Sequence, residues 1–312
     1  MEPNKTAANT TTVQVGGVNI VLSVKDDFAI IPASLKLPNG APRFHLFFPK
    51  AMAQADLGAK YLVFHEAQGG YEPPTRNLLE RTLKRGDLFI DVGAHWGFFT
   101  LQAATHPAGD VSVIAFEPDP TNAGILLRNV ALGGLRQSVS VVCAACGDNA
   151  DLAPLVTNSS MMHSIHGVGL KLPDFTKGPP HWVSVVTLDA ALTRFPQTAG
   201  RRIILKIDAE GFEPKVITGA NALLRSGRVA LIIWEFGQAF ADGAEREGMV
   251  SALGSLSALG FRHVRTASQE VDGPVFPFSI AEAYNGNVFS YHPEVLKDFD
   301  KILTFAAADA AR

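Results

Sequence analysis

Short apolar runs alternate with helically spaced segments through the middle of the chain. Nearly continuous apolar runs predict strands at 88–92, 111–116, 139–143, 203–207 and 229–234. Apolar residues at helical spacing predict helices at 98–105, 120–132, 214–224 and 243–259. Strands of this kind, separated by helices, indicate a mostly parallel sheet covered on both faces. The predicted fold class is therefore α/β with a Rossmann-like core.

The N-terminal part of the chain has a different pattern. Residues 1–13 are rich in Thr, Asn and Ala without an apolar segment, which predicts a disordered tail and no secretory signal. Short β-branched runs separated by turn residues then predict a small antiparallel β appendage over 14–70. The main domain is predicted over 71–312, and its first helix over 75–84.

One segment of the main domain has no convincing period. Between 147 and about 181, Gly, Pro, Ser, Met and His are scattered without a helical or strand pattern. Such a long irregular segment is typical of a functional loop or of disorder. A strand is predicted to follow it at 182–188.

Composition narrows the possible partners. Hydrophobic residues make up 47% and charged residues 18% of the 312 residues, which suits a chain with a large core. A net charge of −3 gives no general attraction to nucleic acid or anionic membranes, and no apolar run is long enough to span a bilayer. Cys143 and Cys146 form a Cys-x-x-Cys pair without the second pair that zinc would need, and Cys143 is expected to point into the core. So few cysteines suit a cytoplasmic location.

A glycine-containing turn follows the first strand of the main domain. Residues 91–97 read Asp-Val-Gly-Ala-His-Trp-Gly and lead from that strand into a helix. Gly93 and Gly97 allow a tight turn and a close approach of the backbone to a ligand. A dinucleotide-binding loop would read Gly-x-Gly-x-x-Gly, but His95 and Phe98 stand at its second and third glycine positions. The turn therefore argues against a pyrophosphate ligand.

Acidic residues stand at the ends of three consecutive predicted strands. Asp91 would repel a pyrophosphate but attract S-adenosyl-L-methionine, which carries an ammonium and a sulfonium and has no phosphate. Glu117 ends the next strand, where a carboxylate can accept hydrogen bonds from both ribose hydroxyls. Gly147 and Asp148 follow the third strand, where an adenine amino group can donate to the carboxylate. These residues together predict a site for this nucleoside at the carboxyl edge of the sheet.

Four segments, in this order and spacing, resemble the FkbM-type methyltransferases. They are 86–97, 115–118 (Ala-Phe-Glu-Pro), 187–189 (Thr-Leu-Asp) and 205–213 (Leu-Lys-Ile-Asp-Ala-Glu-Gly-Phe-Glu). The likeness extends from about Tyr71 to Glu235, and the last two segments are its most specific part. The sequence departs from the family at His95, where the family usually has Asn, and the front segment before Tyr71 lies outside the likeness.

The resemblance implies a class I methyltransferase fold with S-adenosyl-L-methionine as donor. It also implies O-methylation of a small-molecule hydroxylated acceptor, such as a sugar or a secondary metabolite. The candidate cofactor-binding residues are Asp91, Gly93, Ala94, His95, Gly97, Glu117, Pro118, Gly147 and Asp148.

Polar residues after the fourth and fifth strands are candidates for the acceptor site. Asp208 and Glu210 come first, because an aliphatic hydroxyl is a poor nucleophile and needs a general base. His163, in the irregular segment, is a candidate histidine base. Glu235 belongs either to the wall of the site or to a capped turn. Two carboxylates and a histidine can also hold a divalent metal, but no compact ligand pattern supports one, and no metal is predicted.

Residues 206–213 can instead have structural roles. Glu210 can cap the following helix, Asp208 can order its loop, and Glu213 can be a first-turn charge favoured by the helix dipole. Lys206, inside its strand, can form an ion pair.

Two other functions compete with methyl transfer. An NAD(P)-dependent oxidoreductase shares the α/β pattern and the ribose-binding acid, but its glycine spacing is missing. A non-catalytic scaffold would carry a damaged cofactor turn, whereas Asp91, both glycines and Glu117 are present. The N-terminal β segment also offers edge strands through which two copies of the chain can pair as a homodimer.

Overall fold

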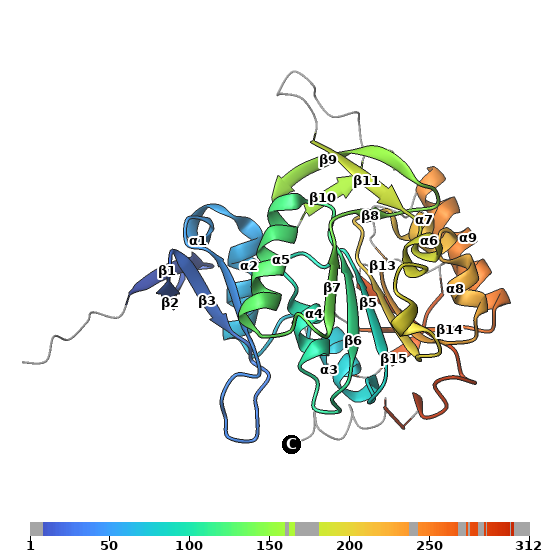
Figure 1. Ribbon diagram of the computed structural model, residues 1–312, viewed down its shortest axis with the longest axis horizontal. Coiled ribbons are helices and arrows are strands. Elements are labelled where there is room, and N and C mark those ends of the chain that lie inside the picture. Colours follow the sequence, from blue (N-terminus) through green and yellow to red (C-terminus); the bar gives the residue numbers. More distant parts are fainter. Residues whose placement is uncertain are drawn as a thin grey trace, which may run out of the picture.

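The predicted apolar runs form the centre of an eight-stranded sheet in the computed structural model of the protein. The structure describes residues 9–159, 162–165, 181–236, 243–267, 273, 275–279, 284, 286–299 and 301–302. The strand order is β15 (Val275–Pro277), β14 (Arg262–Thr266), β16 (Gly286–Tyr291), β13 (Val229–Phe236), β12 (Ile203–Ile207), β5 (Leu88–Val92), β6 (Ser112–Phe116), β7 (Val139–Val142). The strands from β13 to β7 are parallel, and β16 pairs antiparallel with β13 and β14 (Figure 1). The predicted α/β, Rossmann-like class with a mostly parallel sheet is confirmed.

The strand order places the ligand-binding edge. From β5 the chain continues outward to β6 and β7 on one side, and it later enters β12 on the other side. Ligands of such sheets bind beyond the carboxyl ends of the strands where the order reverses. The residues that follow β5, β6 and β12 therefore lie around this point.

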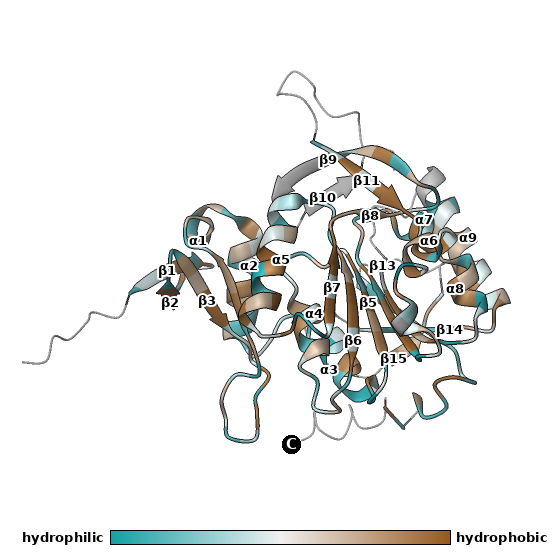
Figure 2. Cartoon of the chain, viewed as in Figure 1, coloured by the Kyte–Doolittle hydropathy of each residue, from teal (hydrophilic) through white to brown (hydrophobic). Residues whose placement is uncertain are grey.

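Helices cover both faces of the sheet and explain why its central strands are buried and mostly apolar. The helices are α3 (Pro73–Thr82), α4 (Phe98–Ala104), α5 (Pro120–Leu132), α6 (Leu188–Leu192), α7 (Glu213–Thr218), α8 (Asn221–Arg225) and α9 (Gly243–Ala258), with a 3₁₀ turn at Pro196–Thr198. Phe89 packs in the apolar cluster that includes α3 to α5, and its neighbours Leu88 and Ile90 pack in the cluster with α7 to α9. The central strands β5 and β12 are accordingly mostly apolar, and Asp91 of β5 and Lys206 of β12 are their charged exceptions (Figure 2). No helix in the described ranges has the length and apolarity to cross a membrane.

The helix predicted at 214–224 is two helices, α7 and α8. A Cβ atom on Gly219 would lie 1.9 Å from the backbone oxygen of Gly147, so the chain passes that loop too closely for a side chain. The close approach occurs where α7 ends and α8 begins. The spacing of apolar residues does not show this interruption of the helix.

The predicted N-terminal β appendage is confirmed, but two helices accompany it. An antiparallel sheet contains β1 (Thr10–Val15), β2 (Val18–Lys25), β3 (Phe28–Pro32) and β4 (His45–Pro49), and α1 (Met52–Ala55) and α2 (Leu57–Ala67) follow. The expected disordered tail is wrong for residues 10–13, because they pair with β2 and Val13 is buried; residues 1–8 lie outside the described part. β1 and β4 are edge strands, and pairing between two copies stays a prediction.

The N-terminal sheet packs directly on the main domain. The Phe48 ring stacks on Trp96 with centroids 5.2 Å apart, and the Phe47 N–H donates to Asn129 Oδ1 at 2.8 Å. The Arg43 guanidinium donates to both carboxylate oxygens of Glu80, at 2.5 and 2.6 Å. Residues 10–67, called the N-terminal module below, therefore share one hydrophobic core with the main domain.

Part of the irregular segment forms a second sheet. Its strands are β8 (Ala145–Cys146), β9 (Asp151–Ser159), β10 (Met162–Ile165) and β11 (His181–Val186), in the order β10-β9-β11-β8. The expectation of an irregular loop over 147–181 is therefore wrong for 151–159 and 162–165. β9 pairs with β11, which is separated from it by more than 20 residues of sequence. The pattern of residues within β9 therefore does not predict this pairing. Residues 160–161 and 166–180 lie outside the described part.

We expect Glu80→Ala to lower the free energy of unfolding by about 3 kcal/mol, because it leaves the buried guanidinium of Arg43 without its carboxylate. Urea denaturation followed by tryptophan fluorescence measures the change. Glu247→Ala, at an exposed position of α9, is the control and should change stability by less than about 0.5 kcal/mol.

The Arg43–Glu80 pair also makes the stability of the protein depend on pH. Burial acts to raise the pKa of Glu80, but the hydrogen bonds and charge of Arg43 outweigh it and lower that pKa. Its contribution to stability is therefore present above the usual carboxyl pKa and is lost as the pH falls through the lowered value. A difference between wild type and Glu80→Ala that grows on acidification would contradict this assignment.

Candidate active site

A cavity of about 670 Å³ lies at the carboxyl edge of the parallel strands. Four acidic side chains from the ends of four strands line it: Asp91 of β5, Glu117 after β6, Asp208 after β12 and Glu235 of β13. The cavity therefore occupies the position that the strand order predicts for a ligand.

Asp91 is buried at the base of the cavity, with 1% of its surface exposed. Its Oδ2 accepts a hydrogen bond from Thr100 Oγ1 at 2.6 Å, while its buried Oδ1 has no hydrogen-bond partner among the described residues. Burial raises the pKa of Asp91, and the nearby charge of Lys206 acts in the opposite direction. A buried acceptor oxygen of this kind suits a cationic donor group on a ligand.

The turn after Asp91 depends on left-handed backbone conformations. Gly93 has φ 77°, and a Cβ atom there would lie 1.8 Å from the backbone oxygen of Asp208. His95 has φ 51°, a conformation in which Asn and His are both enriched among non-glycine residues. This preference gives a physical reason why His can stand where the family usually has Asn. Gly93, Ala94 and His95 all line the cavity.

Gly97 has a packing role behind that turn. It has φ 91° and precedes α4, and a Cβ atom there would lie 2.3 Å from Leu126 Cδ1. Gly97 is not among the residues that line the cavity. Gly97 therefore packs the turn closely against α5, and its direct contact with the cofactor stays a prediction.

Glu117 is held as a hydrogen-bond acceptor at the end of β6. Its Oε2 accepts the backbone N–H of His95 at 2.8 Å, and its Oε1 accepts the N–H of Asp119 at 2.9 Å. Burial raises the pKa of Glu117 to about 7, although these two N–H groups act to lower it. Glu117 and Pro118 both line the cavity, where the carboxylate oxygens can also accept hydroxyl groups of a ribose.

The structure does not bring Gly147 and Asp148 to the cavity. The Gly147 N–H donates to the Val186 oxygen at 2.9 Å, which ties this loop to the end of β11. Asp148 is exposed. Ala144, Ala145 and Cys146, which directly precede Gly147, line the cavity instead. Cys143 is exposed, which contradicts its predicted position in the core.

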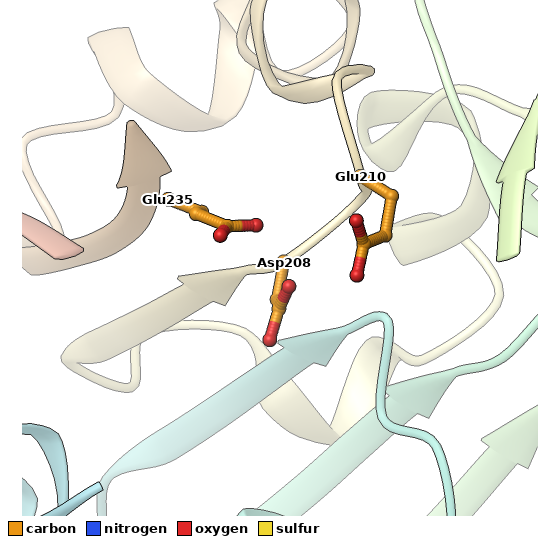
Figure 3. Close-up of side chains that lie close together, drawn as sticks. All are labelled: Asp208, Glu210 and Glu235. Carbon is orange, nitrogen blue, oxygen red and sulfur yellow. The ribbon is translucent and has the colours of Figure 1, made fainter. Parts of the chain in front are cut away.

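Three carboxylates converge at another side of the cavity. Oxygen atoms of Asp208, Glu210 and Glu235 lie within 4.8 Å of one another, and the three side chains lie close together (Figure 3). Burial raises the pKa of Glu210 to about 8, and the negative charges of Asp208 and Glu213 add to this effect. Burial likewise raises the pKa of Glu235, and the Asp208 charge contributes. Within the described part of the chain, these three residues are the group whose oxygens are close enough to hold a metal ion.

Lys206 places a buried positive charge beside these acids. Its Nζ donates to Asp208 Oδ2 at 2.7 Å and lies 5.0 Å from the centre of the Phe99 ring. Burial acts to lower the pKa of Lys206, but the charges of Asp208, Glu72 and Asp91 outweigh it and raise that pKa. The ion pair expected for Lys206 is therefore present, and it lies inside the site.

Glu213 holds the loop that carries Asp208 and Glu210. Its two carboxylate oxygens accept the backbone N–H groups of Ala209 at 2.8 Å and Gly211 at 3.0 Å. Glu213 lies in the first turn of α7, as expected. It is also buried, and by holding the loop it fills the capping role considered for Glu210. Glu210 itself adopts a left-handed φ of 49°, next to Gly211 at 98°.

Glu72 is a site residue that the sequence pattern did not indicate. It lines the cavity, has φ 40° and accepts a hydrogen bond from Asn287 Nδ2 at 2.8 Å. Burial raises its pKa, and Lys206 acts to lower it. Its only sequence signal is its position before Pro73-Pro74, which marks the start of α3. The backbone of His163 lies in β10, and its side chain is outside the described part.

The Thr-Leu-Asp segment has a structural role. The Thr187 side chain accepts the N–H of Ala190 and caps α6. The Asp189 carboxylate accepts the N–H groups of Ala222 and Leu223 at 2.7 and 2.8 Å, and so fixes the start of α8. This motif thus holds the scaffold behind the site.

The described residues fit S-adenosyl-L-methionine. The unpartnered oxygen of Asp91 and the acidic surroundings suit its ammonium and sulfonium groups, and Glu117 suits its ribose. The turn at Gly93 leaves room for a ligand to approach the backbone.

We expect Asp91→Asn and Glu117→Gln each to weaken binding of S-adenosyl-L-methionine by about 10- to 100-fold, because each removes an anionic acceptor. Isothermal titration calorimetry measures the affinity. Asp148→Asn is the matched control, and its affinity should equal that of the wild type. A loss in Asp148→Asn as large as in Asp91→Asn would instead place the adenine near Asp148.

Comparisons with solved structures give low scores. A methyltransferase FkbM from Methylobacillus flagellatus KT is 15% identical, with a TM-score of 0.42, and the match covers 67% of this chain but only 44% of that one. An O-methyltransferase from Bacillus cereus in complex with SAH is 13% identical, with 75% and 89% of the two chains covered and a TM-score of 0.42. A precorrin-6y C5,15-methyltransferase from Geobacter metallireducens GS-15 is 13% identical, with 71% and 89% covered and a TM-score of 0.34. Scores at this level carry no argument about function.

The family assignment rests on a domain match. No curated protein sequence matches the chain. The profile of the methyltransferase FkbM domain matches residues 91–263, which is more than half of the chain and contains Asp91, Glu117, Asp208 and Glu235. The chain therefore belongs to the FkbM family of methyltransferases, with S-adenosyl-L-methionine as its cofactor.

Proposed function

We propose that the protein methylates a hydroxyl group of a small-molecule acceptor, such as a sugar or a secondary metabolite. The observation that carries this proposal is the convergence of Asp208, Glu210 and Glu235 in the same cavity as Asp91 and Gly93. Carboxylates in this position can orient a hydroxyl and remove its proton beside the cofactor site.

The division of roles follows from the contacts of each residue. Asp91 and the turn at Gly93 would hold the amino-acid end of the cofactor, and Glu117 would hold its ribose. When bound, the cofactor supplies an electrophilic methyl group on sulfur. The side chains of this chain position the acceptor and enclose it away from water.

Glu210 is the proposed general base. Asp208 Oδ2 is engaged by the Lys206 ammonium, which stabilises negative charge on Asp208 and leaves its other oxygen to accept a hydrogen bond from the acceptor hydroxyl. The pKa of Glu210, raised by burial to about 8, is close to the pKa range in which a base works best near neutral pH. The Glu210 carboxylate therefore takes the proton from the hydroxyl as the oxygen gains its methyl group.

The remaining expectations belong to the same proposal. The acceptor is a small molecule and is neither nucleic acid nor membrane lipid, in keeping with the net charge of −3. Both cysteines are free thiols, which suits the reducing cytoplasm.

The direct test is a turnover assay with donor labelled in the methyl group. Hydroxylated metabolites and glycosides serve as acceptors, and the label should appear as an acid-stable, base-stable methyl ether. Label found on nitrogen or carbon in the product would contradict O-methylation.

We expect the turnover of the wild type to rise with pH through about 8, because Glu210 must lose its proton before it can act as a base. Glu210→Gln should lower turnover by about 100-fold or more and should remove this rising limb. Donor affinity, measured by calorimetry, should stay within about twofold of the wild type, because Glu210 is not assigned a contact with the donor. A twofold change corresponds to roughly 0.4 kcal/mol of binding free energy. Glu247→Gln, at an exposed position of α9, is the control and should keep the turnover of the wild type. If the rise of turnover with pH persists in Glu210→Gln, the group that loses its proton near pH 8 is not Glu210.

A further inference from the structure

The N-terminal module forms one wall of the cavity. Leu57, Lys60 and Tyr61 of α2 line it, as do Gln14 and Val15 of β1. None of these residues lies in the segment 91–263 that matches the family domain. This wall is therefore an addition to the methyltransferase core.

Ring contacts connect the wall to the Lys206–Asp208 ion pair in the cavity. The Tyr61 ring lies 6.1 Å from Tyr71, and Tyr71 lies 5.8 Å from Phe99. Phe99 lies under the Lys206 ammonium, which pairs with Asp208. A short series of contacts thus connects α2 to the carboxylates after β12.

Two of the α2 side chains that line the cavity are large, mainly apolar and exposed. Leu57 is 66% exposed and Tyr61 is 40% exposed, and they are four residues apart, so they lie on the same side of the helix. Other residues of α2, including Leu62 and Val63, are buried in the shared core. Exposed apolar side chains that line a cavity are typical of a surface covered by a ligand.

We propose that Leu57 and Tyr61 bind the apolar body of the acceptor, and that the acceptor is a hydroxylated molecule with an apolar ring system. This inference rests on the proposed function and deepens it, since it favours a ring-bearing secondary metabolite or glycoside over a free sugar. The ring packs on α2, and the hydroxyl lies at Asp208 and Glu210. The exposed apolar side chains of α2 and the carboxylates after β12 line one cavity, and they match the two ends of such a molecule.

The test compares two glycosides that differ in their aglycone. 2-Naphthyl β-D-glucopyranoside and methyl β-D-glucopyranoside are titrated into the full chain saturated with S-adenosylhomocysteine, and binding is followed by calorimetry. We expect the naphthyl glycoside to bind at least about tenfold more tightly, because it alone covers the apolar wall. Equal affinities, or no binding of the naphthyl glycoside, would overturn the inference.

Variants locate the effect. Leu57→Ser and Tyr61→Ser should each weaken binding of the naphthyl glycoside by about three- to tenfold and leave that of S-adenosylhomocysteine unchanged. Leu127→Ser is the matched control, since Leu127 is a 53% exposed leucine on α5 that does not line the cavity. Unchanged affinity in both α2 variants would overturn the inference, and circular dichroism checks that each variant is folded.

This experiment is independent of catalysis. It measures binding without methyl transfer, so a protein that binds the naphthyl glycoside through Leu57 and Tyr61 but transfers no methyl group to any hydroxyl would refute the proposed function alone. A protein that methylates free sugars but shows no preference for the naphthyl glycoside would refute the inference alone.

Discussion

The Lys206 ammonium is buried inside a central strand, and the charges of the site are arranged around it. Only 3% of Lys206 is exposed, so its charge requires close anionic partners, and Asp208, Glu72 and Asp91 surround it. These partners come from three separate parts of the chain. The lysine thus joins the part of the cavity proposed for the cofactor, the part proposed for the acceptor and the start of α3 in one electrostatic group.

The family motif around Lys206 combines chemical and structural functions in a few residues. Asp208 and Glu210 lie in the cavity, while Glu213 holds their loop through two backbone N–H groups. Left-handed conformations at Glu210 and Gly211 bring the chain from β12 into α7. The Glu210-Gly211 pair in the motif therefore shapes the turn between β12 and α7 in addition to its proposed role in the reaction.

The sequence predicted the elements whose signals are local. Buried parallel strands such as β5 and β12 appear as apolar runs with exact bounds, and the turn after β5 was identified from its glycines and Asp91. Pairings between distant segments were not predicted, since β9 is recognisable only beside β11. Glu72 was missed for the same reason, because its neighbours Lys206 and Asn287 are far from it in sequence.

The close contact between Gly93 and the Asp208 carbonyl also limits how such an enzyme can diversify. Because no side chain fits between the two loops, a backbone shift on the acceptor side moves the donor turn as well. New acceptor preferences gained there would disturb donor recognition. The α2 side chains that line the cavity are not among the atoms that meet at Gly93. Exchange of Leu57 and Tyr61, with the donor site inherited unchanged, therefore offers an easier route to new substrates.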